Sequence, residues 1–244
     1  MTDAPAFLTP VAADFEQRYL AAREKEGWRY DDDAVARLPQ TAPGDPHAAL
    51  WQLRADTAAR FVAHLRERGA RRVMELGCGN GWFSHTIARG TGAAVLGVDI
   101  NETELRQASR VFAAPGLRFA YADVFEAEFE ERFDAVVLNG AVQYFADPPA
   151  LWRRLEGWLA VGGELHVLDS PVYGDAAAAA AARARSADYF AELGVPEMAA
   201  RYHHHTHAAF PGFSQRDSAA TRWLGRLTRQ RRSPFPWLLR RRVG

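Results

Sequence analysis

Short, almost wholly apolar segments alternate with segments of helical periodicity between residues 72 and 168. The apolar segments predict strands at 72–76, 94–98, 117–121, 134–138 and 164–168. Helices are predicted between them at 82–89, 102–113 and 149–159, the last one ended by Gly162 and Gly163. Apolar strands joined by helices are typical of a parallel sheet that is covered on both faces. The pattern therefore predicts an α/β fold.

The remainder of the chain is organised around this core. We expect an N-terminal cap or lid segment at 1–46, a ligand-binding core at 47–173, a helical cap insertion at 174–215 and a C-terminal segment at 216–244. The alanine-rich stretch from Ala176 to Gly194 predicts a strong helix. Residues 237–243 could form a last, antiparallel strand at the sheet edge. A lid and a static cover of the sheet give the same sequence pattern, so both remain open.

The composition argues against several functional classes. Basic and acidic residues number 30 each in 244 residues, so no net charge attracts the chain to nucleic acid or anionic lipid. Cys78 is the only cysteine, so no internal disulfide can form. The N-terminus lacks the apolar stretch of a secretory signal, and no window approaches the roughly 20 apolar residues of a membrane-spanning helix. We therefore expect a cytoplasmic protein that does not bind a membrane.

The most specific motif is the glycine loop ELGCGNGWF at residues 75–83, between the first predicted strand and the following helix. Gly77, Gly79 and Gly81 allow a tight turn and a close approach of the backbone to a ligand. In a doubly wound sheet such a loop lies at the carboxyl ends of the strands, where ligands bind. A dinucleotide-binding loop would carry Gly or Ala at the position of Trp82, so this loop argues against a pyrophosphate ligand.

Two carboxylates follow the next two predicted strands. Asp99 ends the second strand, where a carboxylate can accept hydrogen bonds from both hydroxyls of a ribose. Asp123, with the apolar Val124 beside it, suits an adenine that needs a partner for its amino group and cover for its ring. Alone, Asp99 could equally be a turn or helix-capping residue. Its occurrence with Glu75, the three glycines and Asp123, each after a strand, favours a site for a nucleoside.

Five motifs in this order resemble those of the class I S-adenosylmethionine-dependent methyltransferases. They are VMELGCGNGWFS, GVDIN, ADVF, FDAVVLNGAVQYF and VGGELHVLDSP. The resemblance extends from about residue 50 to 173 and lies within the broad group of small-molecule-type enzymes. More narrowly, the GNGW, LDSPVY and PFPWLL segments resemble an uncharacterised bacterial subfamily. The resemblance implies S-adenosylmethionine as the cofactor and S-adenosylhomocysteine as the product.

The resemblance also implies a cofactor-binding role for particular residues. They are Arg54, Glu75, Gly77, Gly79, Asn80, Gly81, Asp99, Ile100, Asp123, Val124, Asn139 and Gly140. The loop residues border the methionine moiety, and Asp99 holds the ribose. The adenine is contacted by Ile100, Asp123 and Val124. Asn139 and Gly140 offer groups to the methionine amino group. Arg54 could pair with the methionine carboxylate, although a solvated helix charge is an equal alternative.

The chemistry of methyl transfer makes few demands on the protein. The reaction is an in-line displacement from a sulfonium, for which the protein mainly supplies position and electrostatics. No metal is required, and a base is needed only where the acceptor must first lose a proton. Tyr144, Tyr173 and His204 are the candidate bases. Related sequences often carry a histidine where this chain has Gln143, so any base must lie elsewhere.

The histidine-rich stretch at 202–207 has two interpretations. His203 and His207 are four residues apart and would share one face of a helix, so a metal pair is conceivable. No further cysteine or carboxylate lies nearby with ligand spacing. A polar cap segment over the site is the simpler interpretation, and no metal is predicted.

The sequence thus predicts a Rossmann-like, mostly parallel sheet of seven strands with helices on both faces and a helical cap. The predicted function is methyl transfer to O, N or C of a small-molecule acceptor by a monomer or homodimer. One alternative is methylation of nucleic acid or protein, which the arginines within 226–232 and 240–242 would favour. The others are a non-catalytic cofactor-binding subunit and a nicotinamide-dependent oxidoreductase, which Trp82 disfavours.

Overall fold

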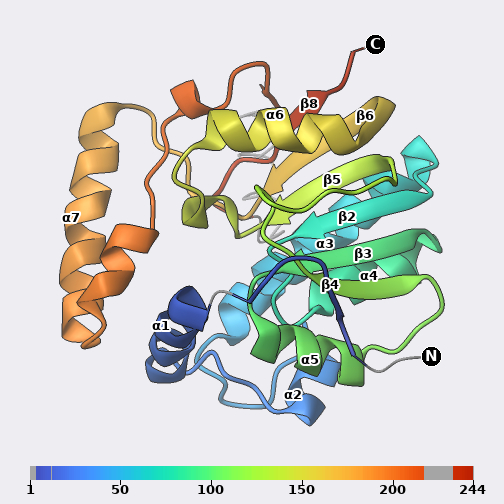
Figure 1. Ribbon diagram of the computed structural model, residues 1–244. Helices are drawn as coiled ribbons and strands as arrows, with labels where there is room; N and C mark the ends of the chain where they lie inside the picture. The colour runs from blue at the N-terminus through green and yellow to red at the C-terminus, as the bar shows by residue number, and fades with distance from the viewer. Residues whose placement is uncertain (1–3, 12, 217–232, 244) are drawn as a thin grey trace, which may run out of the picture.

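An eight-stranded sheet forms the centre of the computed structural model, which describes residues 4–11, 13–216 and 233–243 (Figure 1). The strands are β1 (Ala6–Phe7), β2 (Arg72–Leu76), β3 (Ala94–Asp99), β4 (Leu117–Tyr121), β5 (Phe133–Asn139), β6 (Leu159–Leu168), β7 (Ser214–Gln215) and β8 (Leu238–Arg241). Their order across the sheet is β1-β4-β3-β2-β5-β6-β8-β7. The pairs from β1 to β6 are parallel, whereas β8 is antiparallel to β6 and to β7.

Helices cover both faces of the sheet, as the alternating pattern predicts. They are α1 (Ala13–Lys25), α2 (Asp32–Arg37), α3 (Ala48–Arg68), α4 (Trp82–Thr91), α5 (Glu102–Val111), α6 (Pro148–Trp158) and α7 (Ala176–Glu192), with 3₁₀ turns η1 (Val142–Tyr144), η2 (Pro196–Arg201) and η3 (His207–Ala209). Successive strand residues face opposite layers: Val95 joins the apolar cluster of α3, α4 and α5, whereas Leu96 joins that of α6. None of the described helices is both long and apolar enough to cross a membrane.

The edges of the sheet differ from the prediction. The sheet has eight strands rather than seven: the six whose positions the sequence indicated, and the two-residue strands β1 and β7 on either side of them. The strand predicted at 237–243 is present as β8 and is antiparallel, but β7 lies outside it, so β8 is not the edge. Segments of two residues have no periodicity, which is why neither edge strand was predictable.

Gly162 and Gly163 do not end a helix, contrary to the prediction. Helix α6 already ends at Trp158, since Leu159 has an extended backbone with ψ 143. The register between β5 and β6 then shifts within the first residues of β6. Gly162 has φ 77, and a Cβ at Gly163 would lie 2.9 Å from the carbonyl oxygen of Ala160. The two glycines therefore serve a β-bulge.

Helices α1 and α7 and the turn η2 lie together beside the carboxyl ends of the strands (Figure 1). Ala22, Phe190 and Met198 belong to a small apolar cluster of their own, separate from the two clusters on the sheet. The alanine-rich helix is confirmed: α7 begins after its N-cap Asp175 and ends just before Gly194, which has φ 66. This third cluster brings residues from both ends of the sequence to one side of the sheet.

The segment that leads into α1 is held by residues far along the chain. β1 pairs with β4, and the hydroxyl of Thr9 accepts a hydrogen bond from the backbone N–H of Asp123 at 3.0 Å. Glu16 accepts hydrogen bonds from the N–H groups of Glu102 at 3.2 Å and Thr103 at 2.9 Å, at the start of α5. A carboxylate at a helix N-terminus is stabilised by the free N–H groups there. These contacts fix α1 over the carboxyl ends of the strands.

A buried polar cluster joins α3, β6 and β8. Glu164 is 2% exposed, and its Oε2 lies 2.6 Å from His64 Nε2 and 3.4 Å from His166 Nε2. Its Oε1 lies 2.8 Å from Arg241 Nε and 3.2 Å from Arg68 Nε. Burial would raise the pKa of Glu164, but hydrogen bonds from His166 and His64 outweigh it and lower that pKa. Burial lowers the pKa of His166 to about 4, against the opposing effect of Glu164.

The low pKa of His166 predicts that its contribution to stability disappears in acid. An unfolded histidine titrates near pH 6.5, so below about that value the unfolded chain binds a proton that folded His166 does not bind. Stability is therefore lost as the pH falls from about 6.5 toward 4. Between pH 7 and pH 5 we therefore expect the wild type to lose about 2 kcal/mol more unfolding free energy than His166→Gln, which lacks the titrating group. Urea denaturation of both proteins at the two pH values measures this loss. The other titrating groups are present in both proteins, so their effects cancel in the comparison. A difference that does not change with pH would contradict the prediction.

Candidate functional site

Two adjoining cavities open at the carboxyl ends of the strands. The loop cavity, of about 90 Å³, lies against the glycine loop. The wide cavity, of about 350 Å³, is walled by α1, α3 and α7 and by the segments that follow β5 and β6. The residues common to both walls are Tyr19, Arg23, Trp28, Arg54, Gly140 and Asp169. Ligands in the two cavities would therefore meet.

The glycine loop turns back on itself between β2 and α4. Gly77, Gly79 and Gly81 have φ values of 77, 51 and 79. A Cβ at Gly77 would lie 2.5 Å from the Cβ of Ala141, and one at Gly81 would lie 2.7 Å from the Cβ of Ala108. Positive φ and the lack of space together require glycine at these positions. The turn brings Gly77 and Gly79 into the wall of the loop cavity.

Asp99 fixes this loop from the end of β3. Its Oδ2 accepts a hydrogen bond from the N–H of Gly79 at 2.7 Å, and its Oδ1 accepts from Ile100 at 2.7 Å and Asn101 at 3.0 Å. Burial raises the pKa of Asp99, and these hydrogen bonds oppose the change. Asp99 does not line either of the two cavities. The structure thus gives Asp99 a role in positioning the loop, and its contact with a ribose stays a prediction.

The residues predicted to contact an adenine also lie outside the two cavities. The side chain of Asp123 accepts a hydrogen bond from the N–H of Phe125 at 2.9 Å, while its own N–H donates to Thr9. Val124 is 3% exposed in the apolar layer beside α6, and Ile100 packs against the opposite layer. Their proposed contacts with a ligand stay predictions.

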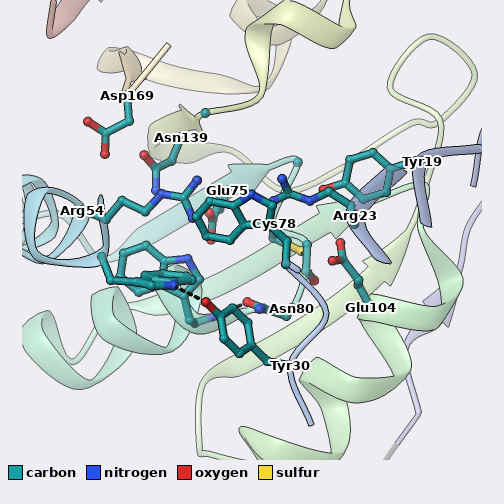
Figure 2. A pocket seen from close by; sticks show the side chains of 16 residues that line it. Tyr19, Arg23, Tyr30, Arg54, Glu75, Cys78, Asn80, Glu104, Asn139 and Asp169 are labelled. Carbon is teal, nitrogen blue, oxygen red and sulfur yellow. Dashed lines mark hydrogen bonds between the residues drawn. The ribbon is translucent and has the colours of Figure 1, made fainter. Parts of the chain in front are cut away.

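The remaining residues that were predicted to bind the cofactor, except Gly81, line the loop cavity (Figure 2). They are Arg54, Glu75, Gly77, Gly79, Asn80, Asn139 and Gly140. Glu75 lies buried at its base and accepts a hydrogen bond from the hydroxyl of Ser84. Burial raises the pKa of Glu75 to about 8. Asn139 Oδ1 is buried and has no hydrogen-bond partner among the residues that the structure describes. Asp169 Oδ2, in the same wall, also has no hydrogen-bond partner within the described part of the chain, so the cavity has two acceptors left for a ligand.

Arg54 of α3 faces the loop cavity from between two indole rings. Its guanidinium carbon lies 4.8 Å from the ring centroids of both Trp28 and Trp51. Burial lowers the pKa of Arg54, Arg23 lowers it further, and Asp169 opposes the change. In Figure 2 Arg54, Asn139 and Asp169 lie on one side of the cavity, and Arg23 lies on the other. This is not the setting of a solvated helix charge, and two guanidinium groups around one cavity favour an anionic ligand.

The three predicted bases are placed differently. Tyr144 and Tyr173 line the wide cavity, whereas His204 does not. Burial raises the pKa of Tyr144 to about 12 and also raises that of Tyr173, so both phenols keep their protons near neutral pH. His204 Nε2 lies 2.9 Å from the hydroxyl of Ser186, which does line the cavity, and burial lowers the pKa of His204. The two tyrosines thus suit hydrogen bonding better than proton abstraction.

The histidine stretch is not a helix, so the prediction that His203 and His207 share a helix face is wrong. His203 is in extended chain, and only His207 belongs to the short turn η3. Hydrogen bonds explain this conformation: the N–H of His203 donates to the carbonyl of Gln143 at 2.6 Å, and that of His207 to Tyr173 at 3.2 Å. The stretch is tied to the segments after β5 and β6 instead of forming its own turn of helix.

Elsewhere in the described residues, one group of side chains has the spacing of metal ligands: His64, Glu164 and His166. The indole N–H of Trp237 donates to His166 Nδ1 at 3.2 Å. A neutral imidazole then carries its proton on Nε2, which is the atom that faces Glu164. Arg68 and Arg241 already balance the carboxylate. The group is therefore arranged as a hydrogen-bonded cluster, at a distance from both cavities.

Comparison with known proteins identifies the family. A family model for a methyltransferase domain matches residues 73–163. An uncharacterised methyltransferase of Mycobacterium tuberculosis is 37% identical over 101 residues, which cover 41% of this chain and 51% of that protein. This chain therefore contains a methyltransferase domain of the class I S-adenosylmethionine-dependent type. The aligned region amounts to about half the length of that relative.

Two further comparisons agree with a methyltransferase fold. Phosphoethanolamine N-methyltransferase 1 of Triticum aestivum is 28% identical over 117 residues, which cover 47% of this chain and 24% of that protein. The structure of the plantazolicin methyltransferase BpumL in complex with S-adenosylhomocysteine matches 93% of this chain and 100% of that chain. Its TM-score is 0.53 and its identity 12%, so this likeness concerns the fold alone.

The cofactor of the family is S-adenosylmethionine, and the loop cavity of this methyltransferase fits its methionine part. That part is a zwitterion, which needs a cation for its carboxylate and acceptors for its amino group. The wall of the cavity contains such a cation, the guanidinium group of Arg54, and an amide acceptor without a partner among the described residues, Asn139 Oδ1. Satisfying a buried acceptor and matching a buried charge both stabilise a bound ligand.

Several residues of the methyltransferase site were missed by sequence reasoning. They are Tyr19, Arg23, Trp28, Tyr30, Glu104 and Asp169. Asp169 could have been found, because it follows β6 directly at the ligand-binding edge. Glu104 has a raised pKa of about 7, mainly because it is buried, but an acidic residue in a first helical turn is ordinarily a helix-stabilising charge. The rest come from the first 30 residues, and nothing in their pattern indicates where α1 lies.

Proposed function

We propose that the chain is an enzyme that transfers the methyl group of S-adenosylmethionine to a small-molecule acceptor in the wide cavity. The observation that carries this proposal is the shared wall of the two cavities, through Arg54, Gly140 and Asp169 among others. A cofactor in the loop cavity would present its sulfonium methyl group to whatever fills the wide cavity. Methyl transfer requires this contact and little else from the protein.

Each part of the site has a role in this proposal. Arg54 binds the carboxylate of the methionine part, and Asn139 binds its amino group. Asp99 holds the glycine loop in place and is expected to bind the ribose. When bound, the cofactor supplies an activated methyl group. The tyrosine hydroxyls of Tyr144 and Tyr173 orient the acceptor by hydrogen bonding, since both keep their protons.

The size and walls of the wide cavity favour a small acceptor. A volume of about 350 Å³ is typical of a small-molecule site, and aromatic side chains from several elements line it. In this proposal residues 1–46 and 174–215 act as the lid over the core at 47–173, with 216–244 completing the sheet. Enclosure by α1 and α7 would exclude water and large substrates.

The arginines near the C-terminus do not favour nucleic acid as the acceptor. Those within 226–232 lie outside the described residues. Arg240 forms an ion pair with Glu156, and Arg241 forms one with Glu164. Arg242 donates to the carbonyls of Glu156 and Leu159. The C-terminal arginines that the structure describes are thus engaged within the protein.

Calorimetry with S-adenosylmethionine and S-adenosylhomocysteine tests the proposal. We expect dissociation constants of about 1–100 μM for the wild type. Arg54→Gln keeps the helix but removes the charge, so it should weaken binding by about tenfold, the effect of one lost charge-assisted hydrogen bond. Arg66→Gln, at an exposed position of the same helix, is the matched control and should bind like the wild type. If folded wild-type protein bound neither compound, the proposed function would be wrong.

A further inference from the structure

Two buried side-chain oxygens at the wide cavity lack hydrogen-bond donors. Gln143, on η1, is 6% exposed, and its Nε2 donates to the carbonyl oxygen of Gly140. This bond fixes the orientation of the amide, because the flipped amide would oppose two oxygens. Gln143 Oε1 and Asp169 Oδ2 then have no partner within the part of the chain that the structure describes. Buried acceptors of this kind are normally satisfied, so a ligand must supply the donors.

Asp169 is held in an unusual conformation at the junction of the two cavities. It has φ 45 and is the one non-glycine residue in the described ranges with positive φ. Its Oδ1 accepts a hydrogen bond from the hydroxyl of Thr57 at 3.0 Å. Burial raises the pKa of Asp169, and Ser233, Thr57, Arg54 and Arg60 oppose the change. Backbone strain that persists at a cavity often serves the function of the site.

The unpartnered oxygens divide between the two cavities. Asn139 lines the loop cavity alone, Gln143 lines the wide cavity alone, and Asp169 lines both. In the proposed function the amino group of the cofactor satisfies Asn139. Gln143 cannot be satisfied in this way, because it is not in the wall of the loop cavity. Its partner must come from the acceptor, and Asp169 lines the same cavity.

The charges around the wide cavity leave Asp169 in need of a cationic or donor group. Arg23 NH1 lies 3.4 Å from Glu26 Oε2, and Glu26 Oε1 also accepts a hydrogen bond from Tyr189 at 2.8 Å. Arg54 would be matched by the carboxylate of the cofactor. Asp169 Oδ2 then remains without a hydrogen-bond donor among the residues that the structure describes. An amine offers several N–H donors and can carry a positive charge, whereas a carboxylate or an ether offers no donor at all.

We propose that the methyl acceptor is an amine whose nitrogen is bound by Asp169 Oδ2 and Gln143 Oε1. This inference rests on the proposed function and assigns the acceptor class within it. In the transfer, the nitrogen lone pair forms the new C–N bond, and the electrons of the broken C–S bond stay on sulfur. Because the amine binds as an ammonium ion, its nitrogen first passes one proton to Asp169, which frees the lone pair for the attack. The methylated nitrogen leaves as a new ammonium ion, and the proton on Asp169 is released to solvent. Asp169 is thereby a catalytic residue, and Gln143 is a binding residue of the acceptor.

Three compounds with the same ring test this assignment: benzylamine, benzyl alcohol and benzoate. Their binding to protein saturated with S-adenosylhomocysteine is followed by saturation-transfer NMR. We expect benzylamine to bind at least about tenfold more tightly than the other two, because only it supplies several donors and a positive charge. Equal signals from all three compounds, or no signal from benzylamine, would overturn the proposal. Calorimetry with S-adenosylhomocysteine comes first: failure there rejects the proposed function, whereas failure with benzylamine alone rejects only the amine site.

Variants separate the acceptor site from the cofactor site. Asp169→Asn and Gln143→Met should each weaken benzylamine binding at least about tenfold and change the dissociation constant of S-adenosylhomocysteine by less than about threefold. Asp56→Asn, an exposed carboxylate on α3, is the control and should change neither. Circular dichroism melting curves verify that each variant is folded. If Asp169→Asn weakened S-adenosylhomocysteine binding more than tenfold, Asp169 would serve the cofactor and the proposal would fail. Unchanged benzylamine binding in both variants would reject it equally.

Discussion

Gly81→Ala is expected to destabilise the fold by about 2–5 kcal/mol and to abolish cofactor binding. A methyl group at this position would lie 2.7 Å from both the Cβ of Ala108 and the Cζ of Phe119, inside a packed layer. Relieving such overpacking costs about 1–3 kcal/mol. The φ of 79 at Gly81 adds about 1–2 kcal/mol for any residue with a Cβ. Urea denaturation measures the loss of stability, and calorimetry measures the loss of binding.

Gly92→Ala is the matched control for this variant. Gly92 has a similar φ of 73, but a Cβ there would meet no atom within 4 Å. We therefore expect only the backbone cost, about 1–2 kcal/mol, and unchanged cofactor binding. If the two variants lost the same stability, packing against Ala108 and Phe119 would not be the reason for glycine at position 81.

Asp99→Asn is expected to weaken the binding of S-adenosylhomocysteine at least about 100-fold. The carboxylate accepts hydrogen bonds from three backbone N–H groups, one of them in the glycine loop. An asparagine has one acceptor oxygen, and its NH₂ group would face a backbone N–H. An unsatisfied buried donor costs about 1–3 kcal/mol, so the loop would move away from its present position. Calorimetry measures the change in affinity, and thermal unfolding establishes that the variant is folded.

Asp123→Asn provides the comparison for Asp99. Its side chain accepts a single backbone hydrogen bond, from Phe125, which the oxygen of an asparagine can still accept. We expect less than about a tenfold loss of affinity. An equal loss of affinity in both variants would mean that the three hydrogen bonds to Asp99 do not explain the effect of Asp99→Asn on binding.

The central fold was predictable because the sheet is buried on both faces. Strands such as β2 and β3 must be apolar almost throughout, and each helix between them must present one apolar face. The order of strands and helices can therefore be predicted from the pattern of apolar residues in short segments. The bulge in β6 was not predictable in the same way. Glycine after a helical pattern usually ends the helix, and only the pairing with β5 reveals that Gly162 and Gly163 belong to a strand.

Apart from Arg54 on α3, the predicted residues that line the loop cavity lie at strand ends or in the loops that follow them. Glu75 and Asn139 sit at strand ends, so their position follows from the strand order. Arg23 and Tyr19 reach the cavities from α1, whose location depends on contacts such as that of Glu16 with Thr103. Contacts between residues so far apart in sequence leave no local pattern. The same reason explains why the spacing of the histidines left a helix conceivable at 202–207, since the hydrogen bonds that fix this stretch run to Gln143 and Tyr173.

The anchoring of Thr9 and Glu16 also constrains the order of events in folding. Their partners lie at Glu102, Thr103 and Asp123, so docking of this segment closes loops of nearly a hundred residues or more. Long loops are entropically costly to close, and such contacts form late, after β3, β4 and α5 are in place. Because α1 supplies Tyr19 and Arg23 to both cavities, the chain would form the central strands of its sheet before it acquires the ability to hold a ligand.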